Sequence, residues 1–194
     1  MPFPPPDVRD LATRAARAQA SRQSTAYGLT NRVFNATLPY FGRRTQMPLV
    51  YFQPRSPGPR PMIDMRQAPP GMEASSWPRR IAGPSGLVVY PHGADYFFNR
   101  PAARQHFADV LTHEFAHTQQ PPQIFRRNAP VPQQQLQIEG GADAFAQLVR
   151  SFVARKALGA RPAMPYSSGY GNMGNQFIDR FGRNRALYGQ FGQP

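Results

Sequence analysis

The chain has 194 residues and a formal net charge of +13, and it contains 23 prolines and 16 glycines. This composition fits one domain with a modest core and long irregular arms. The absence of cysteine excludes disulfides and thiolate metal sites. Residues 1–7 lack the apolar segment of a secretory signal, and the longest apolar run, Leu87–Tyr90, is too short to cross a membrane, so we expect neither a signal peptide nor a membrane span.

Residues 1–80 are predicted to form a proline- and arginine-rich arm. The first six residues favour an extended backbone, and Asp7 can cap a short basic helix that runs to about Arg22. The narrow alanine face of this helix suits docking on a partner or an anionic surface, or packing on its own domain. Prolines confine extended pieces such as residues 47–52 to the edges of a sheet.

Residues 81–160 carry the clearest periodic patterns and are predicted to form the folded domain. Residues 86–90 are predicted to form a strand, because they are a short apolar run followed by a proline. A helix is predicted from about residue 100 to 119, with Pro101 in its first turn. A second helix is predicted from about residue 134 to Gly159, which suits its C-cap.

Residues 161–194 are predicted to form a tail rich in glycine, aromatic residues and arginine, which packs on the domain or on another subunit.

Lysine occurs only at position 156, so arginine supplies almost the whole basic excess of the chain. That excess fits an anionic partner, or a base-composition bias with a solvated surface. Interleaved aromatics and arginines can stack on bases, but nucleic acid is not favoured because no recognised binding motif is present.

The pentapeptide His113-Glu114-Phe115-Ala116-His117 carries the strongest functional signal. On a helix, residues four positions apart lie on one face, so His113 and His117 can bind the same ion. Neutral imidazole is a preferred zinc ligand. Glu114 can reach a water at that ion as a general base. The chain holds only four histidines, which makes a chance match improbable.

A third ligand must come from elsewhere in the chain, because a catalytic zinc site uses three protein ligands. The second helix offers Glu139, and Asp143 lies one turn later, placed to accept a hydrogen bond from a ligating imidazole. In an alternative arrangement Asp143 is itself the third ligand. His106 lies two turns, about 10 Å, before His113 and is too distant to share the ion.

The pattern H-E-x-x-H followed by E-x-x-x-D on a second helix resembles the gluzincins, the thermolysin-like metallopeptidases. The similarity covers roughly residues 86–158. It implies an α+β fold class, with a minimal zincin-like domain in which residues 86–90 form the edge strand of a small sheet. It also implies Zn²⁺ held by His113, His117 and Glu139, with Glu114 as general base and Asp143 orienting a histidine.

The gluzincin resemblance implies hydrolysis of a peptide or amide bond by zinc-activated water. Such sites also need a donor for the oxyanion, and family members often use a Tyr or His from outside the two helices. The candidates in this sequence are Tyr166, Tyr170, His92 and Tyr96.

The long arms favour a second interpretation, in which the protein is a structural component that keeps a zincin domain with little or no activity. Its partners would be other subunits, bound through the N- and C-terminal arms. The arginine bias and the small catalytic domain resemble virion-associated tail proteins of phages. The expected location is therefore the virion, with the bacterial cytoplasm as the alternative.

Overall fold

The computed structural model describes residues 27–41, 49–52, 74–77, 86–89, 101–121, 131–162, 165–166 and 171–189, together with Thr13, Arg17 and Thr25. Of the residues whose side chains are described, 87% are helical and none lies in a strand. The fold is therefore a helical bundle, and the expected α+β fold class is wrong. The physical reason is that helices supply the hydrophobic core.

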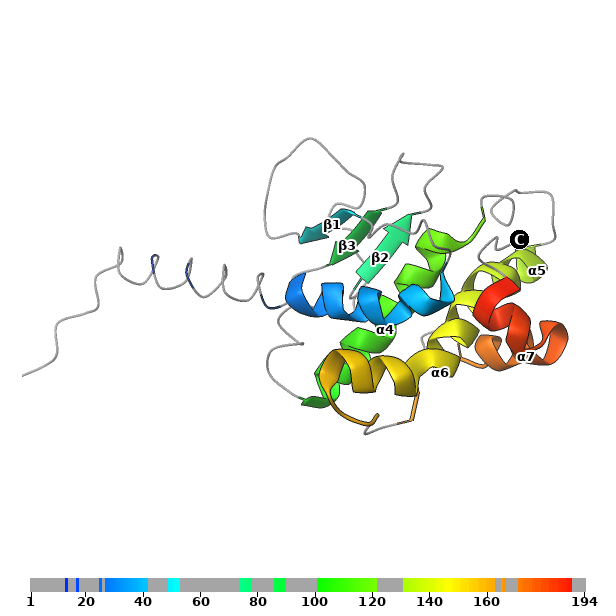
Figure 1. Ribbon diagram of the computed structural model, residues 1–194. Coiled ribbons are helices and arrows are strands. Elements are labelled where there is room, and N and C mark those ends of the chain that lie inside the picture. The colour runs from blue at the N-terminus through cyan, green and yellow to red at the C-terminus, as the bar shows by residue number, and fades with distance from the viewer. Residues whose placement is uncertain are drawn as a thin grey trace, which may run out of the picture.

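Three strands of four residues each lie beside this bundle and pair through their backbones: β1 (Leu49–Phe52), β2 (Ala74–Trp77) and β3 (Gly86–Val89). Their order is β1-β3-β2, with β1 parallel and β2 antiparallel to β3 (Figure 1). The strand expected at residues 86–90 is thus present. It is central, however, and not the edge strand that the gluzincin resemblance implied.

Helix α4 (Pro101–Gln119) matches the helix predicted for this region. Proline is tolerated at its start, because the first helical residue needs no intrahelical amide bond. Phe107, Leu111 and Phe115 recur every fourth residue and are fully buried. The helix therefore turns one apolar face to the core and carries the HExxH sequence in its last two turns.

The second predicted helix is a continuous succession of helical segments. It comprises α5 (Val131–Gln135), the π-helical turn η4 (Leu136–Gly140), α6 (Gly141–Val153) and the π-helical turn η5 (Ala154–Leu158). Gly159 ends it with φ of 69°, a left-handed conformation that glycine adopts without strain. The predicted C-cap is confirmed, and α6 packs along α4.

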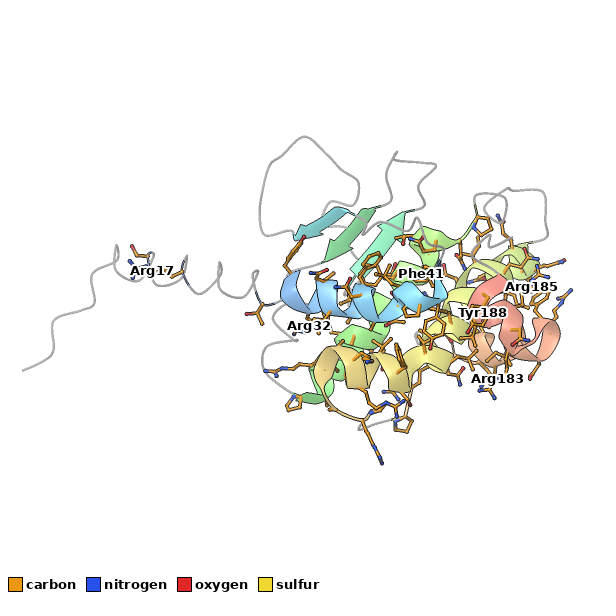
Figure 2. The ribbon with its side chains drawn as sticks, in the orientation of Figure 1. Arg17, Arg32, Phe41, Arg183, Arg185 and Tyr188 are labelled. Carbon is orange, nitrogen blue, oxygen red and sulfur yellow. The ribbon has the colours of Figure 1, made fainter. Side chains whose placement is uncertain are left out.

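An unpredicted helix at residues 27–37 completes the main core. Figure 1 shows it crossing in front of α4, and it continues into the 3₁₀ turn η1 (Leu38–Tyr40). Phe34 meets Phe115 edge to face with ring centroids 5.2 Å apart. Phe41, which is labelled in Figure 2, stacks on Phe145 with ring centroids 5.4 Å apart. This part of the presumed arm therefore belongs to the same core as α4 and α6.

The C-terminal region forms a second, smaller hydrophobic cluster. Helix α7 (Met173–Phe181) and the π-helical turn η6 (Arg185–Gly189) pack on α6 through Ala144, Phe177 and Ala186. Residues expected to form an irregular tail thus include two helical segments. Arg183, Arg185 and the half-exposed Tyr188 lie on the outer surface of this region (Figure 2).

The predicted basic helix of residues 7–22 lies largely outside the described residues, of which only Thr13 and Arg17 fall within it, both helical. In the part of the chain that the structure covers, no helix has the length and hydropathy required to traverse a bilayer.

Candidate metal centre

His113, His117 and Glu139 converge on one point between α4 and η4. The two histidines are buried one turn apart on α4, with ring centroids 4.6 Å apart, and Glu139 reaches them from η4. The Nε2 atoms of His113 and His117 lie 3.0 Å apart. Glu139 Oε2 lies 3.3 Å from His113 Nε2 and 3.1 Å from His117 Nε2.

These separations match what a tetrahedral zinc ion requires of its ligands. Ligand atoms about 2.0–2.1 Å from zinc and about 109° apart are separated by about 3.3 Å. The three observed distances lie between 3.0 and 3.3 Å. This group could therefore hold a metal ion.

Gln120 fixes the orientation of His117, a role that the sequence did not reveal. Its side-chain nitrogen donates to the carbonyl oxygen of Ile138 at 2.8 Å, so its amide oxygen faces His117 Nδ1 at 2.9 Å. An amide oxygen can only accept, so Nδ1 carries the proton and Nε2 keeps its lone pair for an ion. Gln120 is buried and ties α4 to the backbone beside Glu139.

Asp143, the predicted orienting carboxylate, lies within ion-pair distance of the other histidine. Its Oδ1 is 3.8 Å from His113 Nδ1, on the side of the ring opposite Glu139. Burial alone would lower the pKa of His113, but contacts with the Asp143 and Glu139 carboxylates and the negative charge of Glu114 raise that pKa to about 9. In the metal-free protein His113 is therefore an imidazolium at neutral pH.

The carboxylate of Glu139 is in turn attracted by the two histidines. Burial raises the pKa of its carboxyl group, but contacts with His113 and His117 outweigh burial and hold that pKa well below its usual range. Glu139 is consequently ionised and ready to act as a ligand. Glu114, the predicted general base, is partly buried on α4 and close enough for its charge to act on His113.

Of the four predicted oxyanion donors, only Tyr166 lies among the described residues. Its hydroxyl donates to Asp143 Oδ1 at 2.6 Å, which favours a role in supporting Asp143 over one in stabilising an oxyanion. Tyr170, His92 and Tyr96 lie outside the described residues. His106 is partly buried on α4, apart from the metal-ligand group, as expected.

Two glycines allow α7 to approach the ligand-bearing helix closely. A Cβ at Gly140 would lie 2.9 Å from the carbonyl oxygen of Met173, and a Cβ at Gly174 would lie 2.7 Å from Asp143 Oδ2. Real Cβ atoms do not occupy such positions without displacing a neighbour. At Gly140 the close neighbour is the start of α7.

No known protein family, curated protein or solved structure matches this chain significantly. The three convergent donor atoms of His113, His117 and Glu139 are therefore the basis for assigning a function.

Proposed function

We propose that the chain is a zinc-dependent, metallopeptidase-like hydrolase, with His113, His117 and Glu139 as zinc ligands and Glu114 as the general base. The observation that carries the proposal is the convergence of two imidazole nitrogens and one carboxylate oxygen within 3.3 Å of one another. Two neutral nitrogens and a carboxylate are a ligand set that catalytic zinc sites use.

The chemistry of the donors favours zinc over harder ions. Magnesium and calcium prefer sites made of oxygen ligands, whereas two of these donors are imidazole nitrogens. With three protein ligands, a bound zinc ion would have room for a water molecule. When bound, zinc would supply Lewis-acid activation of that water and of a substrate carbonyl.

The side chains around the ion have separate tasks in this proposal. Gln120 accepts a hydrogen bond from Nδ1 of His117 and the Asp143 carboxylate faces Nδ1 of His113, so both rings would present Nε2 to a bound ion. Glu139 adds a negative charge that partly balances the dication. Glu114 takes the proton of the attacking water and returns it to the leaving amine, which is general acid–base catalysis by one carboxylate.

The similarity of the HExxH and ExxxD spacing to that of gluzincins extends the proposal to peptide or amide substrates. A peptide or protein substrate is the one that the resemblance favours.

The test is metal analysis of the purified protein combined with a Glu114→Gln variant. We expect close to one zinc per chain in both proteins, and cleavage of denatured casein or a peptide library by the wild type alone. Asp179→Asn, which changes an exposed carboxylate on α7, is the matched control and should retain cleavage. Failure to bind zinc at neutral pH would refute the proposed centre.

A different outcome would support the alternative function, a structural component of a larger assembly such as a phage virion. In that case zinc binds, but neither the wild type nor Glu114→Gln cleaves any substrate. Chelation of the zinc would then lower the thermal stability of the protein without abolishing an activity, because a structural ion contributes folding free energy.

A further inference from the structure

Tyr166 approaches the candidate metal centre from the chain segment that follows the ligand-bearing helix. Its hydroxyl donates a 2.6 Å hydrogen bond to Asp143 Oδ1, the same oxygen that lies 3.8 Å from His113 Nδ1. Hydrogen bonds to ionised groups are the short and strong ones. Asp143 therefore lies between the imidazole of His113 and the hydroxyl of Tyr166, which follows Asp143 by 23 residues in the chain.

The Asp143 carboxylate has little freedom to turn. Its side chain is 3% exposed, and its second oxygen lies against Gly174, where even a Cβ would approach it to 2.7 Å. Tyr166 and His113 therefore both lie next to Oδ1 of Asp143, and the start of α7 packs against its Oδ2. Loss of the tyrosine hydroxyl removes the 2.6 Å hydrogen bond that holds Oδ1, the shortest one to Asp143 among the described residues.

The ring of Tyr166 is itself held by a buried ion pair. The Arg150 guanidinium lies over the ring, 5.8 Å from its centroid, a distance typical of a cation–π contact. Arg150 is fixed by Asp109 at 2.8 Å, and Asp109 accepts a second bond from Gln105 at 2.9 Å. Tyr166 is therefore anchored to both α4 and α6.

The tyrosine stays a hydrogen-bond donor throughout the physiological pH range. Burial, followed by the negative charge of Asp143, raises the pKa of Tyr166 well above its usual range. Because the hydroxyl keeps its proton, it continues to donate its hydrogen bond to the Asp143 carboxylate.

We propose that Tyr166 is a positioning residue of the metal centre, which holds the Asp143 carboxylate in place beside Nδ1 of His113. With Asp143 fixed, the Nδ1 proton of His113 stays on the carboxylate side and the Nε2 lone pair is directed at the ion. This inference rests on the proposed zinc centre, but the positioning contact exists in the metal-free protein and can be tested there.

The experiment compares Tyr166→Phe with Tyr188→Phe, which removes a hydroxyl from a half-exposed tyrosine that stacks on Tyr40. In metal-free protein, NMR of the imidazole nitrogens should show a changed Nδ1 signal for His113 in Tyr166→Phe only. The signal of His117, which Gln120 holds, is the internal control. Zinc affinity should fall about tenfold in Tyr166→Phe, the lower end for partners beyond the ligands, and stay within twofold in the control.

A double-variant cycle with Asp143→Asn separates positioning from a general structural effect. If Tyr166 acts through Asp143, adding Tyr166→Phe to Asp143→Asn should weaken zinc binding no further. Additive losses, or an unchanged His113 signal in Tyr166→Phe, would overturn the inference. Should the wild type bind no zinc, the proposed function fails, while the NMR comparison in metal-free protein still decides the role of Tyr166.

Discussion

Zinc binding to this site should release one proton per ion at neutral pH, because a ligand nitrogen must first lose its proton. His113 has a pKa of about 9 in the metal-free fold, against an ordinary value of 6.5. At pH 7 the imidazolium therefore opposes binding by about 3 kcal/mol, at 1.36 kcal/mol for each pKa unit. The apparent affinity should rise about tenfold for each pH unit well below this pKa, and about 25-fold between pH 7 and pH 8.5.

The stability of the metal-free protein should change in the opposite direction over the same range. A group whose pKa is raised on folding stabilises the folded state fully below its unfolded value, here 6.5. That contribution is lost as pH rises toward about 9, so the free energy of unfolding should fall from pH 6.5 to pH 9. Zinc affinity and metal-free stability thus move with opposite signs.

The assay is a zinc titration against a competing chelator at several pH values and constant ionic strength. Calorimetry in buffers of different ionisation enthalpy counts the protons released. Asp143→Asn removes one contact that raises the His113 pKa, so the pH at which affinity stops rising should be lower in this variant. An affinity that is constant from pH 7 to pH 8.5, or binding without proton release, would refute the reasoning.

Three substitutions test other parts of the structure. Gln120→Leu removes the acceptor for a ligand imidazole and should weaken zinc binding about 10–100-fold, whereas Gln119→Leu, its neighbour, should stay within twofold; equal affinities would contradict the orienting role. Phe115→Ala empties a fully buried position and should lower the free energy of unfolding by about 3–5 kcal/mol in urea titrations, and a loss below about 1 kcal/mol would refute its core role. Gly174→Ala places a Cβ 2.7 Å from Asp143 Oδ2 and should cost about 1–3 kcal/mol by the same assay, so an unchanged midpoint would show that α7 is free to shift.

The helices with local signals were predictable from the sequence, and those stabilised by distant contacts were not. Helix α4 has a proline at its first position, a proline after its end and apolar residues every fourth position. The helix at residues 27–37 contains Thr30, Asn31 and Asn35, which are weak helix formers. Leu29, Val33 and Phe34 are buried at helical spacing, but this apolar stripe is short, and the packing on α4 and α6 that stabilises the helix cannot be seen in the local sequence.

The candidate site divides in the same way. The spacing of His113 and His117 brings them together on any helix, so their pairing follows from local geometry alone. Their meeting with Glu139 depends on how α6 packs against α4. Gln120 follows His117 by three residues, a spacing that could have indicated a contact, whereas the bond from Tyr166 to Asp143 depends on the path of the chain after the helix.

Because the second hydrophobic cluster is small, we expect α7 to open separately from the main core. The larger cluster holds α4, α6 and the helix at residues 27–37, and Leu187 of η6 also packs against it. The smaller cluster holds α7 against α6 through Phe177 and Ala144. In native-state hydrogen exchange we expect the amides of α7 to exchange through a sub-global opening, at a free energy below that of α4. During such openings Gly174 moves away from Asp143, while both histidines stay on the intact helix α4. The two histidines and the part of α7 that packs against Asp143 can therefore fluctuate on different timescales.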